Sequence, residues 1–317
     1  MTVRRTFFDA WSPALDLDVA RLPETELCTR ELLREICATP GPKRIGVARD
    51  ADGPVAIVPF LVGSRRWEPL LQWILPGTLG LARGDGDVFA AFPRAATSHV
   101  GWWRQSTPPP ASPFVFNVKH DRAYGMALAD DPVPHWKTTS QWQHVKAARN
   151  RCVGFQMRVN APGMAEWTIR SWEAHWRTTT DAHYPDLPYR VVGALDLERR
   201  GRHFTLTLHD GDKPVAGHTF VRHGDAVVWQ LSHRDPDYDK QNVATRLLDM
   251  AFDWARDLGV PIMDLGALHA YKARWAPELR DRYEFDYAHP ALRALDAGAR
   301  RARAIAGALK RRLGGRR

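Results

Sequence analysis

The pattern of apolar and polar residues is clearest in the C-terminal third of the chain. Turn clusters at residues 210–212 (Asp-Gly-Asp) and 223–225 (His-Gly-Asp) separate runs rich in strand-forming residues. This pattern predicts a β-meander that begins at His203. The segment that follows it has a different period and predicts a different element.

Residues 242–258 carry apolar side chains at helical spacing, and Gly259 follows as a C-cap. Residues 261–266 then indicate a short buried strand that ends at the carboxylate of Asp264. A strand that leads into a helix N-terminus is a ready site for an anion. A second strand beside the first leaves a cleft in which an extended cofactor can lie.

An earlier segment repeats part of this pattern. Residues 45–62 and 204–221 each contain a strand, an acidic turn and a Pro-Val-Ala tripeptide that opens a second strand. Pro54–Ala56 matches Pro214–Ala216. Hairpins converge on this pattern, so chance similarity is the alternative. If the match is real, the chain holds two related α+β halves.

Two further segments carry candidate phosphate contacts. Residues 76–87 form a Gly-rich stretch without a strand-to-helix switch, which predicts either a phosphate cradle or a plain surface loop. Residues 138–152 predict a helix that presents His144, Lys146, Arg149 and Arg151. That helix has either a solvated basic face or a contact with a phosphorylated acceptor.

Length and composition limit the class of protein. The chain of 317 residues can form one large or two ordinary domains. No run approaches the roughly 20 apolar residues that span a bilayer, and Asp9, Asp16 and Asp18 interrupt the N-terminal stretch that resembles a signal peptide. Its three cysteines stand at unrelated spacings, which favours neither a disulfide framework nor a metal site. We therefore expect a cytoplasmic location, with peripheral contact to the inner membrane face as an option.

Positive charge is concentrated at the C-terminal end. Residues 290–317 hold nine Lys or Arg and one Asp, a net charge of +8, whereas the whole chain carries +9 and the remainder +1. A DNA partner is therefore not expected. Apolar residues recur every three to four positions from Leu292 onward, which predicts a basic amphipathic helix. This helix could contact an anionic membrane surface or an acidic partner such as an acyl carrier protein or tRNA, or be a solubilising or body-packed terminus.

Residues 205–275 resemble the GNAT acyltransferase superfamily. The resemblance is strongest to the double-GNAT branch associated with cellulose and exopolysaccharide biosynthesis, which is akin to the Fem-type aminoacyl transferases. It extends to the basic helix at 140–152, to the helix with His175-Trp176-Arg177 and to Asp264-Leu265-Gly266 followed by Tyr271-Lys272.

The resemblance implies an α+β fold with two GNAT-like halves and a C-terminal basic amphipathic helix. Each half would be a mixed, mostly antiparallel sheet flanked by helices. The expected boundaries are 1–137 for a degenerate N-terminal half, 138–289 for the acyltransferase half and 290–317 for the tail. A degenerate N-terminal half agrees with the missing strand-to-helix switch near residues 76–87.

One position departs from the family's pyrophosphate loop. Residues 240–246 (Lys-Gln-Asn-Val-Ala-Thr-Arg) match this loop, and Ala244 stands where the family has Gly. Ala is small enough for close approach, but it does not relieve backbone strain at positive φ. The resemblance therefore implies acyl-CoA binding without securing it.

The implied reaction is acyl transfer from a thioester, with acetyl-CoA or another acyl-CoA as co-substrate and no metal. It needs a polarised carbonyl, a base for the acceptor and a proton for the leaving thiolate. The catalytic candidates are Asp264, Tyr271, Lys272 and His218. The candidate CoA-binding residues, by analogy with the splayed strand and the phosphate loop, are Leu231, Ser232, His233, Lys240, Gln241, Asn242, Val243, Ala244 and Thr245.

Each catalytic candidate has a structural alternative. Asp264 is a base or acceptor ligand, or else it caps the next helix or pairs with Lys272. Tyr271 is an acid toward the thiolate or a core residue, and Lys272 binds a phosphate or an oxyanion or lies on the surface. His218 faces the cleft or is satisfied by its neighbours, and His233 and Asp235, which follow the splayed strand, could also serve as the base.

Three functions fit these observations. The leading one is acyl transfer to an amino or hydroxyl group of a sugar or cell-envelope precursor, an acceptor class that rests on family analogy. The second is a Fem-like transferase that uses aminoacyl-tRNA. The third is a degenerate GNAT-like binding protein held at a membrane by its tail.

Overall fold

The computed structural model describes residues 3–63, 66–75, 77–95, 97–102, 108–180, 184–266, 269–295, 297–299, 301–302 and 305. The strands are β1 (Arg4–Phe8), β2 (Lys43–Asp50), β3 (Gly53–Val62), β4 (Arg66–Pro69), β5 (Leu81–Ala82), β6 (Thr97–Trp102), β7 (Val115–Ala127), β8 (Gln156–Val159), β9 (His203–Asp210), β10 (Lys213–His223), β11 (Ala226–Arg234), β12 (Ile262–Gly266) and β13 (Glu278–Tyr287). The α-helices are α1 (Pro13–Ala20), α2 (Arg30–Ala38), α3 (Val133–Thr138), α4 (Gln141–Arg151), α5 (Met164–Thr180), α6 (Leu187–Arg199), α7 (Val243–Asp257) and α8 (Ala270–Ala273). Three 3-10 helices are η1 (Leu70–Trp73), η2 (Asp85–Ala91) and η3 (Pro236–Gln241).

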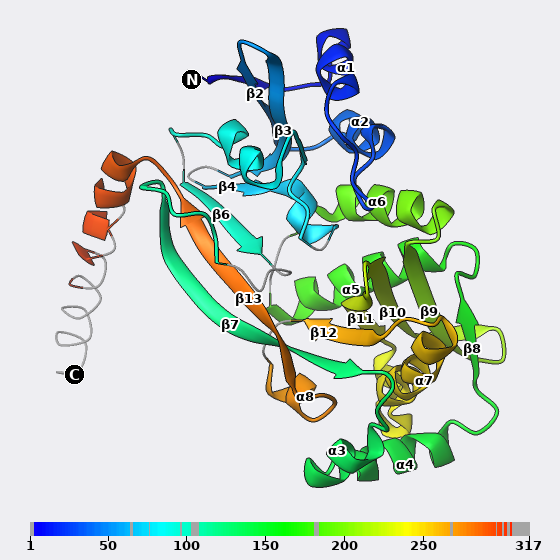
Figure 1. Ribbon diagram of the computed structural model, residues 1–317. Coiled ribbons are helices and arrows are strands. Elements are labelled where there is room, and N and C mark those ends of the chain that lie inside the picture. The colour runs from blue at the N-terminus through cyan, green and yellow to red at the C-terminus, as the bar shows by residue number, and fades with distance from the viewer. Residues whose placement is uncertain are drawn as a thin grey trace, which may run out of the picture.

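The strands form one twisted sheet that runs through the molecule (Figure 1). The order is β1-β2-β3-β4-β6-β13-β7-β12-β11-β10-β9-β8, and β5 pairs with β3 outside this path. The pairing is antiparallel except between β4 and β6 and between β11 and β12. The predicted α+β class with mostly antiparallel pairing is therefore confirmed.

The two halves repeat the same order of elements. Each begins with a strand, two helices, a hairpin and a further strand, namely β1-α1-α2-β2-β3-β4 and β8-α5-α6-β9-β10-β11. Both hairpins even carry the same bulge, because the register skips Val55 in β3 and Val215 in β10. A bulge bends a strand at a fixed position. The repeat that the sequence indicated is thus a repeat in the structure.

The halves exchange their last long strands. In the N-terminal half, β6 pairs with β13 rather than with β7, and in the C-terminal half β12 pairs with β7 rather than with β13. The two exchanged strands pair with each other at the centre of the sheet (Figure 1). A chain boundary at 137/138 therefore leaves each half with a strand supplied by the other.

Helices cover both faces of the C-terminal half. A side chain at Gly217 would collide with Thr168 of α5, whereas Phe220, three residues along the same strand, packs on Trp254 of α7. Successive side chains of a strand point to opposite faces, so α5 and α7 lie on opposite sides of the sheet. The α7 face holds the main core, with Phe252, Trp136 and Trp275 in contact.

The start of the tail is helical, as predicted. Residues 290–295, 297–299, 301–302 and 305 are helical, and the side chains of Leu295 and Ile305 are exposed. Arg293 places its guanidinium 5.5 Å from the ring centre of Phe116. The rest of the predicted amphipathic helix lies outside the described residues. Within the described part, no helix is long and apolar enough to cross a membrane.

Candidate functional site

The parallel strands β11 and β12 diverge in the middle of the sheet. Their pairing ends at Val228 opposite Asp264, although β11 continues to Arg234. A bulge at Gln230 turns β11 away, because the register with β10 passes from Phe220–Trp229 to Thr219–Leu231. The other strand, β12, continues along β7 instead. The cleft expected between two neighbouring strands is therefore present as a wedge that opens beyond Val228 and Asp264.

Asp264 lies at the mouth of this wedge rather than at the end of its strand. It is 5% exposed, and its Oδ1 accepts a hydrogen bond of 2.7 Å from the backbone N–H of Gly266. The sequence placed the end of the strand at Asp264, but the strand runs two residues further because β7 continues to pair with it.

Lys272 and Arg282 bring positive charge to the same place. Lys272 Nζ lies 5.3 Å from the ring centre of Trp229. Burial lowers the pKa of Lys272 to about 8, with Asp264 opposing the shift and Arg282 adding to it. Lys272 is thus a half-buried amine beside a carboxylate. An amine with this pKa changes its charge close to neutral pH.

Tyr271 joins this centre to helix α7. The ring of Tyr271 packs against Trp275 with 6.4 Å between centroids. Burial raises its pKa, and the nearby Trp275, Arg234 and Thr245 lower it. Thr245 belongs to the first turn of α7, so the Tyr271 hydroxyl lies where that helix begins. A proton donor there is suited to a leaving group held by the helix.

The N-terminus of α7 has no side-chain cap. Its N-cap residue, Asn242, adopts the left-handed conformation (φ 59°, ψ 42°) and makes no side-chain cap hydrogen bond. The first-turn N–H groups of an α-helix have no intrahelical partner, and the helix dipole favours negative charge at this end. The residues concerned, Val243, Ala244 and Thr245, are those that the family loop predicts.

The positive φ falls on Asn242 and not on Ala244. Asn tolerates the left-handed region better than most residues, because its short polar side chain can bond locally. Ala244 lies inside the first turn of the helix and is not among the residues with positive φ. The concern that Ala at this position strains the loop is therefore unfounded.

Basic side chains surround this helix end. Arg151 of α4 donates a 2.7 Å hydrogen bond to the carbonyl of Lys240, and the buried Asp249 binds both Arg149 and Arg246. The basic helix expected at 138–152 is thus α4, packed beside α7, and it begins at Gln141. Of the two arginines of α4, Arg149 is held by Asp249, and Arg151 lies at the carbonyl of Lys240, just before α7.

His218 is buried and neutral. Its ring stacks on Trp229 with 5.2 Å between centroids, and its Nε2 lies 3.3 Å from Ser232 Oγ. Burial lowers the pKa of His218 to about 3. A ring with this pKa is a weak base at neutral pH, so these contacts fit positioning of Ser232 and Trp229 better than proton transfer.

The remaining strand candidates have partners of their own. The Leu231 N–H donates to Thr219 Oγ1 at 3.2 Å, which makes it the least available oxyanion donor of the three residues 231–233. Burial, together with the neighbouring His175, lowers the pKa of His233 to about 4. Asp235 pairs with Lys213 at 2.9 Å and receives the N–H of Asp237, so it acts in the turn before α7.

Sequence reasoning missed Trp229 as a support for Lys272 and His218, and it missed Arg282. Both follow from tertiary structure, since Trp229 precedes a bulge and Arg282 lies on the exchanged strand β13. The alternation of charged and aromatic residues in 280–287 could have predicted a strand there, but such a pattern does not indicate which strand it pairs with.

Comparisons with known proteins agree with this geometry. Residues 141–283 match the model of the acetyltransferase (GNAT) domain family. The matched segment runs from α4 into β13, and it does not include β7, which supplies a strand to this half of the sheet. This stretch of the chain is thus similar to a GNAT domain, and the prediction of a GNAT-type acyltransferase is confirmed at that level. Among curated proteins, no sequence matches this chain.

Solved structures are similar to this chain at low sequence identity. The C-terminal DUF2156 domain of a protein assigned as lysylphosphatidylglycerol synthetase from Agrobacterium fabrum is 16% identical with a TM-score of 0.51, over 89% of this chain and 94% of that one. FemX is 8% identical (TM-score 0.48; 92% and 99% covered), and a tandem GNAT protein from the clavulanic acid pathway is 13% identical (TM-score 0.46; 90% and 98% covered). At these identities the likeness concerns the fold alone.

Proposed function

We propose that this protein transfers an acyl group from an acyl-CoA, with acetyl-CoA as the first donor to test, to an amino or hydroxyl group of a sugar or cell-envelope precursor. The observation that carries the proposal is the wedge between β11 and β12, which opens toward the uncapped N-terminus of α7. An extended thioester can pass through such a wedge while its phosphates bind the helix end.

The donor's phosphates would meet the N–H groups of residues 243–245, with Arg151 and Lys240 beside them. The pantetheine arm would then run between the diverging strands toward Trp229. In this pose the thioester sulfur lies near Tyr271 and the carbonyl near Lys272. Holding both substrates in line supplies much of the acceleration in such reactions.

The residues have separate roles in the transfer. The acceptor nitrogen attacks the thioester carbonyl carbon, and Asp264 takes the proton that the nitrogen loses. The Lys272 ammonium stabilises the oxyanion of the tetrahedral intermediate. When the carbon–sulfur bond breaks, Tyr271 gives its proton to the thiolate. Exchange with solvent restores both groups, so the products are the acylated acceptor and free CoA.

Release of free CoA thiol measures this reaction directly. We expect acetyl-CoA to raise the unfolding temperature of the wild-type chain, because a ligand that binds only the native state stabilises it. Thiol release should then depend on an added amino or hydroxyl acceptor. A folded protein whose unfolding temperature does not respond to acetyl-CoA or to longer acyl-CoAs would refute the proposal.

A second donor class is favoured by the charge around α7. His144, Lys146, Arg151 and Lys240 lie on or beside the α4–α7 pair, which suits a polyphosphate backbone as well as a CoA. The Agrobacterium domain carries the name of a lysyl transferase, which also fits an aminoacyl donor. Aminoacyl-tRNA binding that weakens steeply with salt, without acyl-CoA binding, would favour this donor.

The third reading, a degenerate binding protein, loses its main argument. It rested on Ala244, and the left-handed position is Asn242. Attachment of the tail to an anionic membrane remains a proposal, and sedimentation with anionic vesicles, with and without residues 290–317, tests it. Equal sedimentation of the two proteins would contradict membrane attachment.

A further inference from the structure

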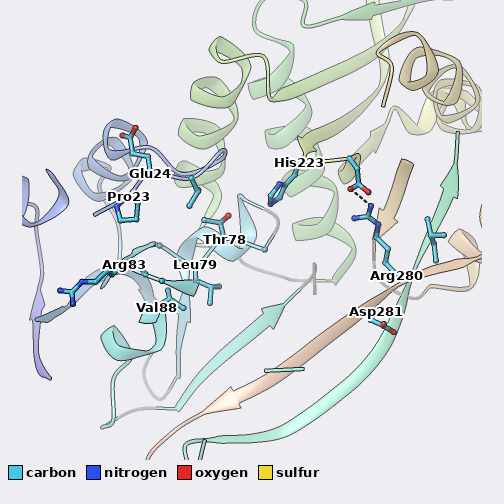
Figure 2. A pocket seen from close by; sticks show the side chains of 16 residues that line it. Pro23, Glu24, Thr78, Leu79, Arg83, Val88, His223, Arg280 and Asp281 are labelled. Atoms are coloured by element: carbon cyan, nitrogen blue, oxygen red, sulfur yellow. Dashed lines mark hydrogen bonds and ion pairs between the residues drawn. The ribbon is translucent and has the colours of Figure 1, made fainter. Parts of the chain in front are cut away.

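A cavity of about 800 Å³ lies where the two halves meet. Loops of the N-terminal half, at residues 23–25 and 77–84, form one wall, and His223, Asp225 and residues 279–281 form the other. Figure 2 shows these walls on opposite sides of an open space. The volume lies within the range of cavities that hold small-molecule ligands.

The Gly-rich segment is built to form a wall of this cavity. A side chain at Gly80 would lie 2.1 Å from the carbonyl oxygen of Ile57, so only glycine lets the loop approach β3 this closely. Gly77 has a positive φ of 68°, and the Arg83 N–H bonds to the carbonyl of Val55 at the bulge. The loop is therefore held against β3, where it forms a wall of the cavity.

The cavity is polar and carries more acid than base. Its charged lining residues are Glu24, Asp225 and Asp281 against Arg83 and Arg280. Both arginines already bind carboxylates, Arg280 to Asp225 at 2.8 Å and Arg83 to Asp50 at 3.0 Å. Asp225 is itself occupied by Arg280, and Asp281 pairs with His120 at 2.9 Å, so the lining has an excess of only one carboxylate. Because both guanidinium groups of the lining are already paired, the cavity disfavours a phosphorylated ligand and favours one with hydroxyl and ammonium groups.

The cavity reaches toward Asp264. Leu279 lines it, and the side chain of Leu279 also packs on Gly125, the cross-strand partner of Asp264. Asp225 lies on the rim, three residues before Val228, and Val228 pairs with Asp264. Three residues of a strand span about 10 Å, which estimates the distance from the rim to Asp264. A molecule that touches both Asp225 and Asp264 must therefore be longer than one small ring.

We propose that this cavity binds the acceptor, and that the acceptor is an extended, unphosphorylated amino-sugar chain with at least two amino groups. One ammonium group lies at the acidic rim that Asp225 and Asp281 help to line, and the reacting nitrogen lies at Asp264. The inference rests on the proposed function for the reacting end only. The donor's phosphates bind at α7, on the face of the sheet opposite to the cavity. The sheet therefore separates the negative charge of the donor from the positive charge of the acceptor.

Glucosamine oligomers test the proposal. The full chain is titrated with the glucosamine trimer, the glucosamine monomer, the fully N-acetylated trimer and glucosamine 6-phosphate, without donor and then with acetyl-CoA. We expect the trimer to bind tightest, and we expect the N-acetylated trimer and the phosphate to bind at least about tenfold more weakly. Preference for the phosphate, or equal binding of trimer and monomer, would overturn the proposal.

Two variants locate the site. Asp225→Asn and Asp281→Asn should each raise the KM for the trimer at least about fivefold and leave the KM for acetyl-CoA within about twofold. Asp212→Asn is the matched control, because Asp212 is also an exposed hairpin aspartate paired with an arginine, Arg158 at 3.1 Å, but lies outside the cavity. Thermal unfolding checks that each variant is folded. If one of the two cavity variants is unfolded, the KM of the other tests the site.

The two proposals fail in different ways. If acetyl-CoA binds and is turned over while both cavity variants keep the wild-type KM for the trimer, the acceptor site is wrong and the proposed function stands. If no acyl-CoA binds but the trimer binds and the variants weaken it, the proposed function is wrong and the cavity assignment stands.

Discussion

The two halves share a scaffold and differ in one connection. In both, a hairpin with the same bulge leads to a strand that pairs in parallel with a later one, β4 with β6 and β11 with β12. Between the parallel strands, the C-terminal half has the 15-residue α7, whereas the N-terminal half has η1, β5 and η2. The repeat therefore preserves the sheet, and the helix makes one half suited to a phosphate-bearing donor.

The N-terminal half uses its connection in another way. The segment from Gly77 to Gly84 replaces a helix and packs on β3, so that its backbone faces the cavity between the halves. In the arrangement we propose, one half holds the donor and the other supplies a wall for the acceptor. Exchange of β7 and β13 joins the two halves in one continuous sheet.

The largest expected difference lies at the last paired position of each parallel pair. Asp264→Asn should lower kcat by about 10²–10⁴, the usual contribution of a proton-transfer group, and Lys272→Ala should lower it by about 10²–10³, the usual cost of losing one oxyanion donor. Ser98 takes the same register position in the N-terminal half, opposite Trp67, and Ser98→Ala should leave kcat within about twofold. Thiol release measures kcat, and circular dichroism checks the fold. Undiminished activity of both C-terminal variants would remove these residues from the mechanism.

Acid should loosen the C-terminal half first. Burial lowers the pKa of His218 to about 3 and that of His203 to about 4, against 6.5 in the unfolded chain. Below pH 6.5 these two histidines are protonated in the unfolded chain but stay neutral in the folded one. The free energy of unfolding therefore decreases as the pH is lowered from 6.5 to the folded pKa values. The loss is about 2 kcal/mol for each ring at pH 5.

Hydrogen exchange at pH 7.5 and pH 5 tests this expectation. The amides of β9 to β11 should lose protection on acidification, and those of β2 and β3 should lose less. His218→Phe removes one titrating group and should reduce the pH dependence of unfolding. Equal loss of protection in both hairpins would show that acid acts elsewhere.

The reaction should slow at alkaline pH. The pKa of Lys272 is about 8 because of its burial, and the ammonium form stabilises the oxyanion in our scheme. Above pH 8 this form is lost, so the rate at saturating substrates should be about tenfold lower at pH 9 than at its maximum. Lys272→Arg should move this decline to higher pH, because guanidinium stays charged. A rate that rises through pH 9 in the wild type would instead assign Lys272 as a base.

The local pattern of the sequence was sufficient for the elements around the wedge. Turn residues at 210–212 and 223–225 predicted the meander, and the apolar spacing of 242–258 predicted α7, because both depend on neighbours in the chain. The exchange of β7 and β13 joins segments about 160 residues apart and leaves no periodic signal. For that reason the sequence did not predict the contribution of Arg282, the role of Leu279 or the cavity itself. It also did not predict the left-handed conformation of Asn242.

The smallest expected effect is a difference in the KM for acetyl-CoA between variants at two similar helix N-termini. Asn242 before α7 and Ser140 before α4 are both left-handed and both lack a side-chain cap hydrogen bond. Replacing either by Val should cost about 1–2 kcal/mol of stability, since a β-branched side chain is strained at positive φ. Only Asn242→Val should also raise the KM for acetyl-CoA, by about fivefold, because only α7 opens into the wedge. Asn242→Gly, which relieves the strain, should restore the KM. Thermal unfolding and initial rates measure both effects, and an equal rise in KM for Ser140→Val would mean that the donor's phosphates bind α4 rather than α7.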